Sequence, residues 1–136
     1  MQALRTDEAR VYRAEGARFE APRTLDELRA ELKELCRGVE RPEVIEPIVH
    51  SFQDKEHLRI GVRDLLGKDD IRATTAALSD LAEVLLADIA TRQEPIVAAR
   101  HGIPKLANGQ PSRYVLLALG KLGGREIQYC KVDDEA

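Results

Sequence analysis

Apolar residues recur every three or four positions through most of residues 24–101, and this spacing predicts a bundle of amphipathic helices. The pattern starts after Thr24-Leu-Asp-Glu27, a capping box in which the threonine hydroxyl and the glutamate satisfy two early backbone N–H groups. Glycines that follow the apolar stripes predict the helix ends. The first stripe consists of Leu25, Leu28, Leu32 and Leu35, and the expected stops are Gly38, Gly67 and Gly102.

Two further helical segments are expected after the first one. Residues 43–66 form either one bent helix or two, with Pro42 placed at the first helical turn, where its missing N–H costs little. A long helix follows a cap at Asp69 or Asp70, and its apolar residues on more than one side indicate the centre of a bundle. We expect Pro95 to kink this helix or to start a new segment.

The apolar pattern changes after a loop at residues 102–112. Tyr114 to Leu119 is a continuous apolar run of strand length, Gly123-Gly124 predicts a turn, and Ile127 to Val132 predicts a second strand. A lone hairpin is marginal in water, so the run is expected to pack on the long helix or to form a homodimer through these strands.

The expected fold is therefore mainly α, a helical bundle followed by a short C-terminal β-hairpin. Residues 1–23 are interpreted as an N-terminal arm, residues 24–101 as the helical region and residues 113–136 as the unit that contains the hairpin.

Composition excludes several classes of function. The chain has 136 residues and a net charge of −3, with 4% aromatic residues and no Trp, so neither a phosphate-tracking basic face nor base stacking is expected. No apolar run is long enough to cross a membrane, and the first residues do not form a signal peptide. Cys36 and Cys130 match no metal or redox spacing, so a reduced cytoplasmic protein with inert cysteines is expected.

Three stretches carry a resemblance to one family. They are His57-Leu-Arg-Ile-Gly-Val-Arg-Asp-Leu-Leu-Gly67, Leu78-Ser-Asp-Leu-Ala82 and Leu119-Gly-Lys-Leu-Gly-Gly-Arg-Glu-Ile-Gln-Tyr129. Together they resemble the bacterial glutamine synthetase adenylyltransferase, or adenylyl-removing enzyme. The resemblance implies a helical region in front of a nucleotidyltransferase domain related to DNA polymerase beta. It also implies AMP transfer from ATP to a tyrosine of glutamine synthetase or phosphorolytic removal of that AMP, with regulatory signal proteins as further partners.

The same resemblance implies roles for particular residues. Gly123, Gly124 and Lys121 would meet the nucleotide phosphates, because glycine lets backbone N–H groups approach closely. In the family, two aspartates on the next strand hold magnesium, at the eighth and tenth positions after the second glycine. Those positions are Val132 and Asp134 in this chain, so Asp134 is the one candidate metal ligand and the first carboxylate is missing.

Asp133 and Glu135 form a similar pair out of register by one residue, which would turn both side chains to the other face. The interpretation is a truncated nucleotidyltransferase palm, limited to its first hairpin in residues 113–136. We expect it to be inactive by itself and to bind neither Mg²⁺ nor ATP, the cofactors of the intact family. No catalytic residue is assigned.

A second hypothesis belongs to a different class: a non-catalytic helical module that binds glutamine synthetase or a nitrogen regulator. Other polar residues are given structural roles. His50, His57 and His101 have no metal-binding pattern, and Asp69-Asp70 are capping or solvated residues. Arg59 and Arg63, four residues apart on one helix face, are expected to form structural ion pairs.

Overall fold

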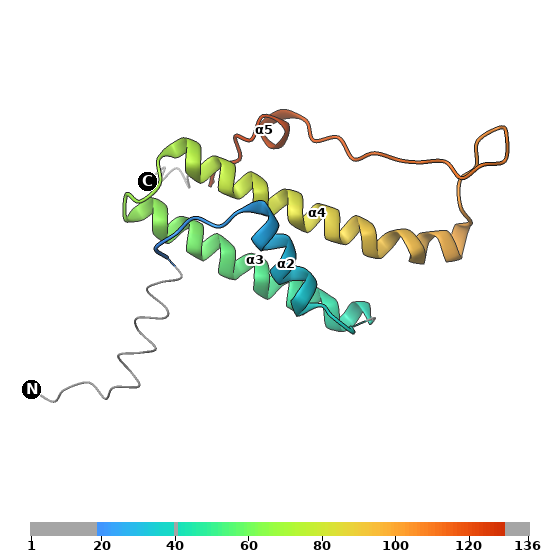
Figure 1. Cartoon of the computed structure of the whole chain (residues 1–136), viewed down its shortest axis with the longest axis horizontal. Helices are drawn as coiled ribbons and strands as arrows, with labels where there is room; N and C mark the ends of the chain where they lie inside the picture. Colours follow the sequence, from blue (N-terminus) through green and yellow to red (C-terminus); the bar gives the residue numbers. More distant parts are fainter. Residues whose placement is uncertain (1–18, 40, 130–136) are drawn as a thin grey trace, which may run out of the picture.

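The described part of the computed structural model covers residues 19–39 and 41–129, and its body is a bundle of three helices. In Figure 1, α3 and α4 run side by side in opposite directions, and α2 packs against both. A single helical turn, α5, lies near the far end of the chain. The bounds are Leu25–Leu35 for α2, Pro42–Leu65 for α3, Ile71–His101 for α4 and Gly120–Gly123 for α5.

The helix starts follow from local side-chain chemistry. The Thr24 hydroxyl accepts a hydrogen bond from the backbone N–H of Glu27 at 3.3 Å, and the Glu27 carboxylate accepts one from the backbone N–H of Thr24 at 2.8 Å. Asp70 caps α4 by accepting from the backbone N–H of Ala73 at 2.8 Å. Pro42 stands at the first turn of α3. The predicted capping box, the Asp70 cap and the position of Pro42 are confirmed.

Both long helices continue through an internal proline. Residues 42–65 form one helix that includes Pro47, which settles the choice between one helix and two. The helix α4 likewise runs unbroken through Pro95. The expectation that Pro95 starts a new segment is wrong, because a proline removes only one backbone hydrogen bond and the turns on either side keep theirs.

The core forms where the apolar stripes of the three helices meet. Phe52 of α3 is 2% exposed and Leu81 of α4 is 1% exposed, and both belong to one buried cluster. Partly buried residues from both ends of the chain pack around this cluster, including Leu25 and Ile127. The buried apolar residues of this cluster are Leu28, Leu32, Cys36, Phe52, Ile60, Leu78, Leu81, Val84 and Leu85.

The predicted C-terminal β-hairpin is absent from the described residues, which contain no strand and only an isolated bridge between Lys105 and Pro111. Residues 113–119 are extended but unpaired, and the glycines after them form the helical turn α5. Gly124 has helical backbone angles of −81° and −3°, so the chain does not reverse there as a hairpin requires. The second half of the predicted strand, residues 130–132, lies outside the described residues.

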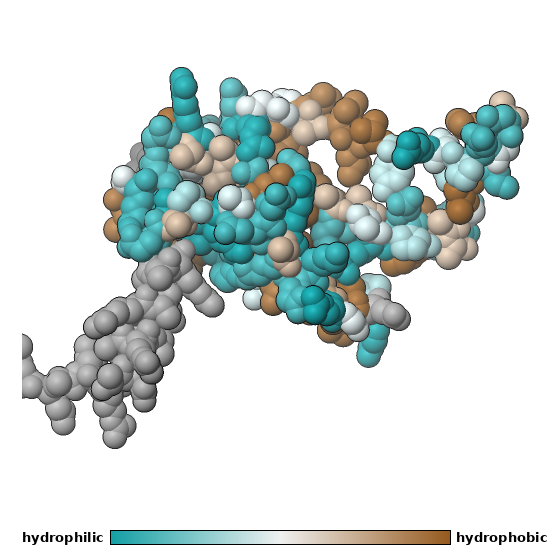
Figure 2. Space-filling view, in the orientation of Figure 1, coloured by the Kyte–Doolittle hydropathy of each residue, from teal (hydrophilic) through white to brown (hydrophobic). Residues whose placement is uncertain are grey.

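The apolar run 114–119 does not pack on the long helix as expected. Val115 is 73% exposed, Leu117 76% and Leu119 82%. Figure 1 shows the run as an extended segment separate from α4, and Figure 2 shows its apolar side chains on the molecular surface. With no strand at this segment, dimerisation through paired strands is not supported. None of the described helices is long and apolar enough to cross a membrane.

Candidate functional site

The glycine motif that follows the apolar run forms one compact turn. Gly120 opens the turn with φ of 59°, a left-handed conformation that glycine adopts without strain. The backbone N–H groups of Gly123 and Gly124 donate to the carbonyls of Leu119 and Gly120, at 3.3 and 2.9 Å. These two N–H groups therefore hold the turn closed by bonds inside the motif.

The two adjacent glycines differ in how much space surrounds them. A Cβ atom at position 123 would lie 2.4 Å from the carbonyl oxygen of Ala118, a backbone atom that cannot move without opening the turn. A Cβ atom at position 124 would lie 3.4 Å from the Gly120 carbonyl oxygen, which is an ordinary contact. Steric demand for glycine is thus concentrated at Gly123.

An arginine directly after the turn ties it to α4. The Nη2 atom of Arg125 lies 2.5 Å from an Asp80 carboxylate oxygen, and Nη1 lies 3.9 Å from Glu83. Glu83 also pairs with Arg29 of α2 at 2.6 Å, so one acidic pair of α4 faces both the turn and α2. Because Arg125 is 47% exposed, this contact contributes on the order of 0.5 kcal/mol and acts mainly in positioning.

A tyrosine forms the second anchor, on α3. The Tyr129 hydroxyl donates to the His57 carbonyl oxygen at 2.7 Å, and the two rings meet edge to face with centroids 6.3 Å apart. The hydroxyl fits there because Gly61 has no side chain; a Cβ atom at that position would lie 3.3 Å from it. Burial raises the pKa of Tyr129, and the nearby Asp64 carboxylate adds to this rise.

The predicted nucleotide-binding residues lie together on the exposed surface of the turn. Lys121, Gly123 and Gly124 are all solvent-accessible, and their nucleotide-binding role stays a prediction. Asp134, the candidate metal ligand, lies outside the described residues, as do Val132, Asp133 and Glu135. Within the described ranges, no group of three or more His, Cys, Asp or Glu side chains could hold a metal ion.

Sequence analysis missed the two anchors, Arg125 and Tyr129, and their receiving positions, Asp80 and Gly61. The signal was present in the three stretches that carry the family resemblance. The sequence gives no sign that these stretches are in contact, but the structure brings them together. The stretch 119–129 supplies both anchors, and the stretches 57–67 and 78–82 supply the residues that the anchors bind.

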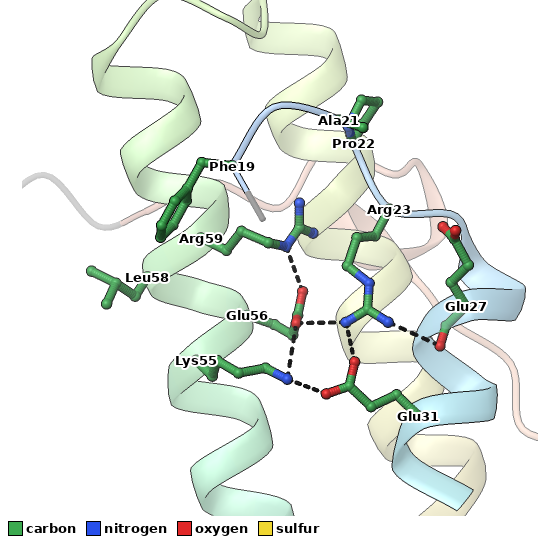
Figure 3. Close-up of a pocket in the computed structure, with 10 residues that line it drawn as sticks. All are labelled: Phe19, Ala21, Pro22, Arg23, Glu27, Glu31, Lys55, Glu56, Leu58 and Arg59. Atoms are coloured by element: carbon green, nitrogen blue, oxygen red, sulfur yellow. Dashed lines mark hydrogen bonds and ion pairs between the residues drawn. The ribbon is translucent and has the colours of Figure 1, made fainter. Parts of the chain in front are cut away.

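A second polar region lies at the opposite face of α3, beneath residues 19–23. Glu56 is 1% exposed and accepts hydrogen bonds from Arg23 at 2.9 Å and from Arg59 at 2.7 Å (Figure 3). One turn further along α3, Arg63 binds both carboxylate oxygens of Asp69 at 2.6 Å. The hydrogen bonds from Arg63 lower the pKa of Asp69. The expected ion pairs of Arg59 and Arg63 are confirmed.

Comparison with known proteins decides the family. Residues 2–133 match the family described as glutamate-ammonia ligase adenylyltransferase. The chain belongs to this family. It is 40% identical over 78 residues to the bifunctional glutamine synthetase adenylyltransferase/adenylyl-removing enzyme of Thioalkalivibrio sulfidiphilus, covering 57% of this chain and 8% of that protein.

Two other relatives with the same name show the same relation. The protein of Shewanella loihica is 28% identical over 104 residues, which cover 76% of this chain and 11% of the relative. That of Xanthomonas campestris is 41% identical over 71 residues, which cover 52% and 8%. The chain therefore spans about a tenth of the length of these relatives. No solved structure matches it.

Proposed function

We propose that this adenylyltransferase-family chain is a helical platform that holds a phosphate-binding glycine turn in place and carries out no chemistry by itself. The supporting observation is the pair of anchors on either side of the bundle. Arg125 bonds Asp80 on α4, and the Tyr129 hydroxyl bonds the His57 carbonyl on α3. A turn fixed at two points loses less conformational freedom when a ligand binds, so more of the binding energy is retained.

The whole enzyme's reaction is part of the same proposal: transfer of AMP from ATP to a tyrosine of glutamine synthetase, or its phosphorolytic removal. Lys121 supplies one exposed cationic side chain, and the glycines leave the surface beside it free of side chains, while the N–H groups of Gly123 and Gly124 are bonded within the turn. The described residues offer no carboxylate cluster for magnesium, so no step through that ion is assigned to them.

Nucleotide binding tests the proposal directly. The chain is titrated with ATP in the presence and absence of Mg²⁺, with binding followed by calorimetry. In contrast to the expectation from the sequence, we expect saturable ATP binding, and Gly123→Val and Gly124→Val should abolish it while the helical circular dichroism signal is unchanged. Lys121→Gln should weaken binding by about tenfold, the value of one charge-assisted hydrogen bond.

The matched control is Lys105→Gln, which removes another exposed lysine from the loop before the turn. If Lys105→Gln and Lys121→Gln weaken binding equally, the effect is one of net charge and the turn is not the site. Absence of saturable binding at millimolar ATP contradicts the phosphate-binding role.

A non-catalytic interaction module remains the second candidate, and one observation favours it. The apolar run 114–119 is exposed along its length, and such a surface on a soluble domain marks a contact site. If this candidate is right, the chain should bind purified glutamine synthetase in sedimentation-velocity experiments, and Leu117→Asp should abolish the binding. Leu65→Asp, at an 87% exposed position on α3, is the control. Equal loss in both variants, or no complex, contradicts this candidate.

A further inference from the structure

One arginine in the charged region beneath residues 19–23 is only partly used. The Nε–H of Arg59 donates a hydrogen bond to the Glu56 carboxylate at 2.7 Å, and the Arg59 side chain is 7% exposed. Neither terminal nitrogen of the guanidinium has a hydrogen-bond partner among the described residues, and Figure 3 shows this end pointing from α3 toward the segment 19–23. These two nitrogens, which have no partner within residues 19–39 and 41–129, form a planar pair of donors that matches the two oxygens of a carboxylate.

Arg59 lines a cavity of about 500 Å³. Its walls are polar on one side and apolar on the other. Polar side chains come from α2, from α3 and from Arg23 of the segment above, and apolar groups come from that segment and from the outer face of α3 (Figure 3). The apolar wall consists of Phe19, Ala21, Pro22 and Leu58. A ligand that binds here would therefore combine an anionic group with an apolar body.

The charged side chains around the cavity bear on the kind of anion that it can bind. Three cations, Arg23, Lys55 and Arg59, surround two carboxylates, Glu31 and Glu56, in one connected network. The network thus carries one positive charge in excess.

Glu27 also lines the cavity, but its carboxylate is bonded to Thr24 at the start of α2. The charge of Glu27 offsets the excess of the network, so the lining is neutral overall and a monoanion would be held by the directed hydrogen bonds of Arg59. A dianion such as phosphate would add repulsion from Glu27 and the other carboxylates.

We propose that this cavity, here called the Arg59 cavity, binds a small organic monocarboxylate with an apolar body. The carboxylate meets the two free nitrogens of Arg59, and the apolar body lies against Phe19, Pro22 and Leu58. The site is separate from the glycine turn and does not depend on nucleotide binding.

Benzoate is the probe, and benzyl alcohol is its uncharged counterpart of similar size. Both are titrated into the ¹⁵N-labelled chain, and chemical shifts of the Arg59 Nε–H and of the amides in residues 55–59 are followed by NMR. We expect saturable shifts with benzoate and about tenfold weaker binding of benzyl alcohol, because the alcohol lacks the charge-assisted hydrogen bonds. Inorganic phosphate should bind more weakly than benzoate.

Variants distinguish the effect of the planar guanidinium of Arg59 from the effect of its positive charge. Arg59→Lys keeps the positive charge and removes the planar pair of donors, so benzoate affinity should fall about tenfold. Arg100→Lys, in the exposed last turn of α4, is the matched control and should leave affinity unchanged. Leu58→Ala trims an exposed apolar wall residue, which leaves folding intact and should weaken benzoate by a few-fold.

The proposal is overturned if benzoate gives no saturable shifts, or if benzyl alcohol binds as tightly. A folded Arg59→Lys variant with unchanged affinity also overturns it. Phosphate that binds as tightly as benzoate overturns the assignment to a monocarboxylate. If Arg59→Lys does not fold, the comparison of the two probes on the unaltered chain and on Leu58→Ala decides the question.

Discussion

Replacing Gly61 by alanine should have opposite effects on the bundle and on the anchored turn. The residue lies inside α3, where glycine costs about 1 kcal/mol relative to alanine. The new Cβ atom would lie 3.3 Å from the Tyr129 hydroxyl oxygen, so the tyrosine has to move by a few tenths of an ångström. That movement weakens its 2.7 Å hydrogen bond to His57, an interaction of about 1 kcal/mol.

The two effects can be separated with a double-mutant cycle that uses Tyr129→Ala. In the Tyr129→Ala background the tyrosine is gone, so Gly61→Ala should raise the free energy of unfolding by the full helix gain of about 1 kcal/mol. In the original background the gain should be smaller by roughly 0.5–1 kcal/mol, the coupling expected for residues in contact. Urea denaturation followed by circular dichroism measures all four proteins.

Hydrogen exchange adds a local readout of the same prediction. Gly61→Ala should speed amide exchange in residues 125–129 even where global stability rises, because the anchor is loosened while the helix is strengthened. If Gly61→Ala gives the same stability change in both backgrounds, within about 0.3 kcal/mol, the contact between Gly61 and Tyr129 does not exist in solution.

Three further predictions concern the bundle itself. Because the hydrogen bonds from Arg63 lower the pKa of Asp69, the stability from this pair is present above the ordinary carboxyl pKa and is lost as pH falls through the lowered one. Asp69→Asn should therefore destabilise by about 3 kcal/mol at pH 7, since it removes the charge partner of a buried arginine. The difference from the original chain should shrink in urea titrations below pH 4, and a constant difference contradicts the prediction. Thr24→Ala should cost about 1 kcal/mol through loss of the α2 cap, and an unchanged denaturation midpoint would refute that role. Phe52→Ala should cost about 3–5 kcal/mol in the same assay, and a loss under 1 kcal/mol would mean that Phe52 is not in the core.

The sequence predicted the helices well because their signals are local. A capping box spans four residues, and an apolar stripe repeats within one or two turns, so Thr24, Asp70 and Pro42 could be placed without knowing the rest of the fold. The two internal prolines were harder to interpret. Whether a helix continues past Pro47 or Pro95 depends on packing against neighbouring helices, which the local sequence does not contain.

The prediction of a C-terminal hairpin was wrong because a strand depends on a partner that is not local in the sequence. An apolar run such as residues 114–119 indicates a strand only if another strand pairs with it, and no neighbour in the described residues does so. The short turn at Gly120–Gly123 formed instead, because its hydrogen bonds are all local. The three stretches of family resemblance contained the anchors Arg125 and Tyr129, but the pairing could not be assigned from the sequence because the partners are 45 and 72 residues away in the chain.

The contact between Tyr129 and α3 is the most direct test of the central claim that the bundle holds the glycine turn. NMR spectra of the chain should show nuclear Overhauser effects between the Tyr129 ring protons and the α-protons of Gly61, together with effects to the His57 ring. The account predicts strong cross-peaks for both pairs. Absence of these cross-peaks, with Tyr129 ring shifts at their random-coil values, would contradict it.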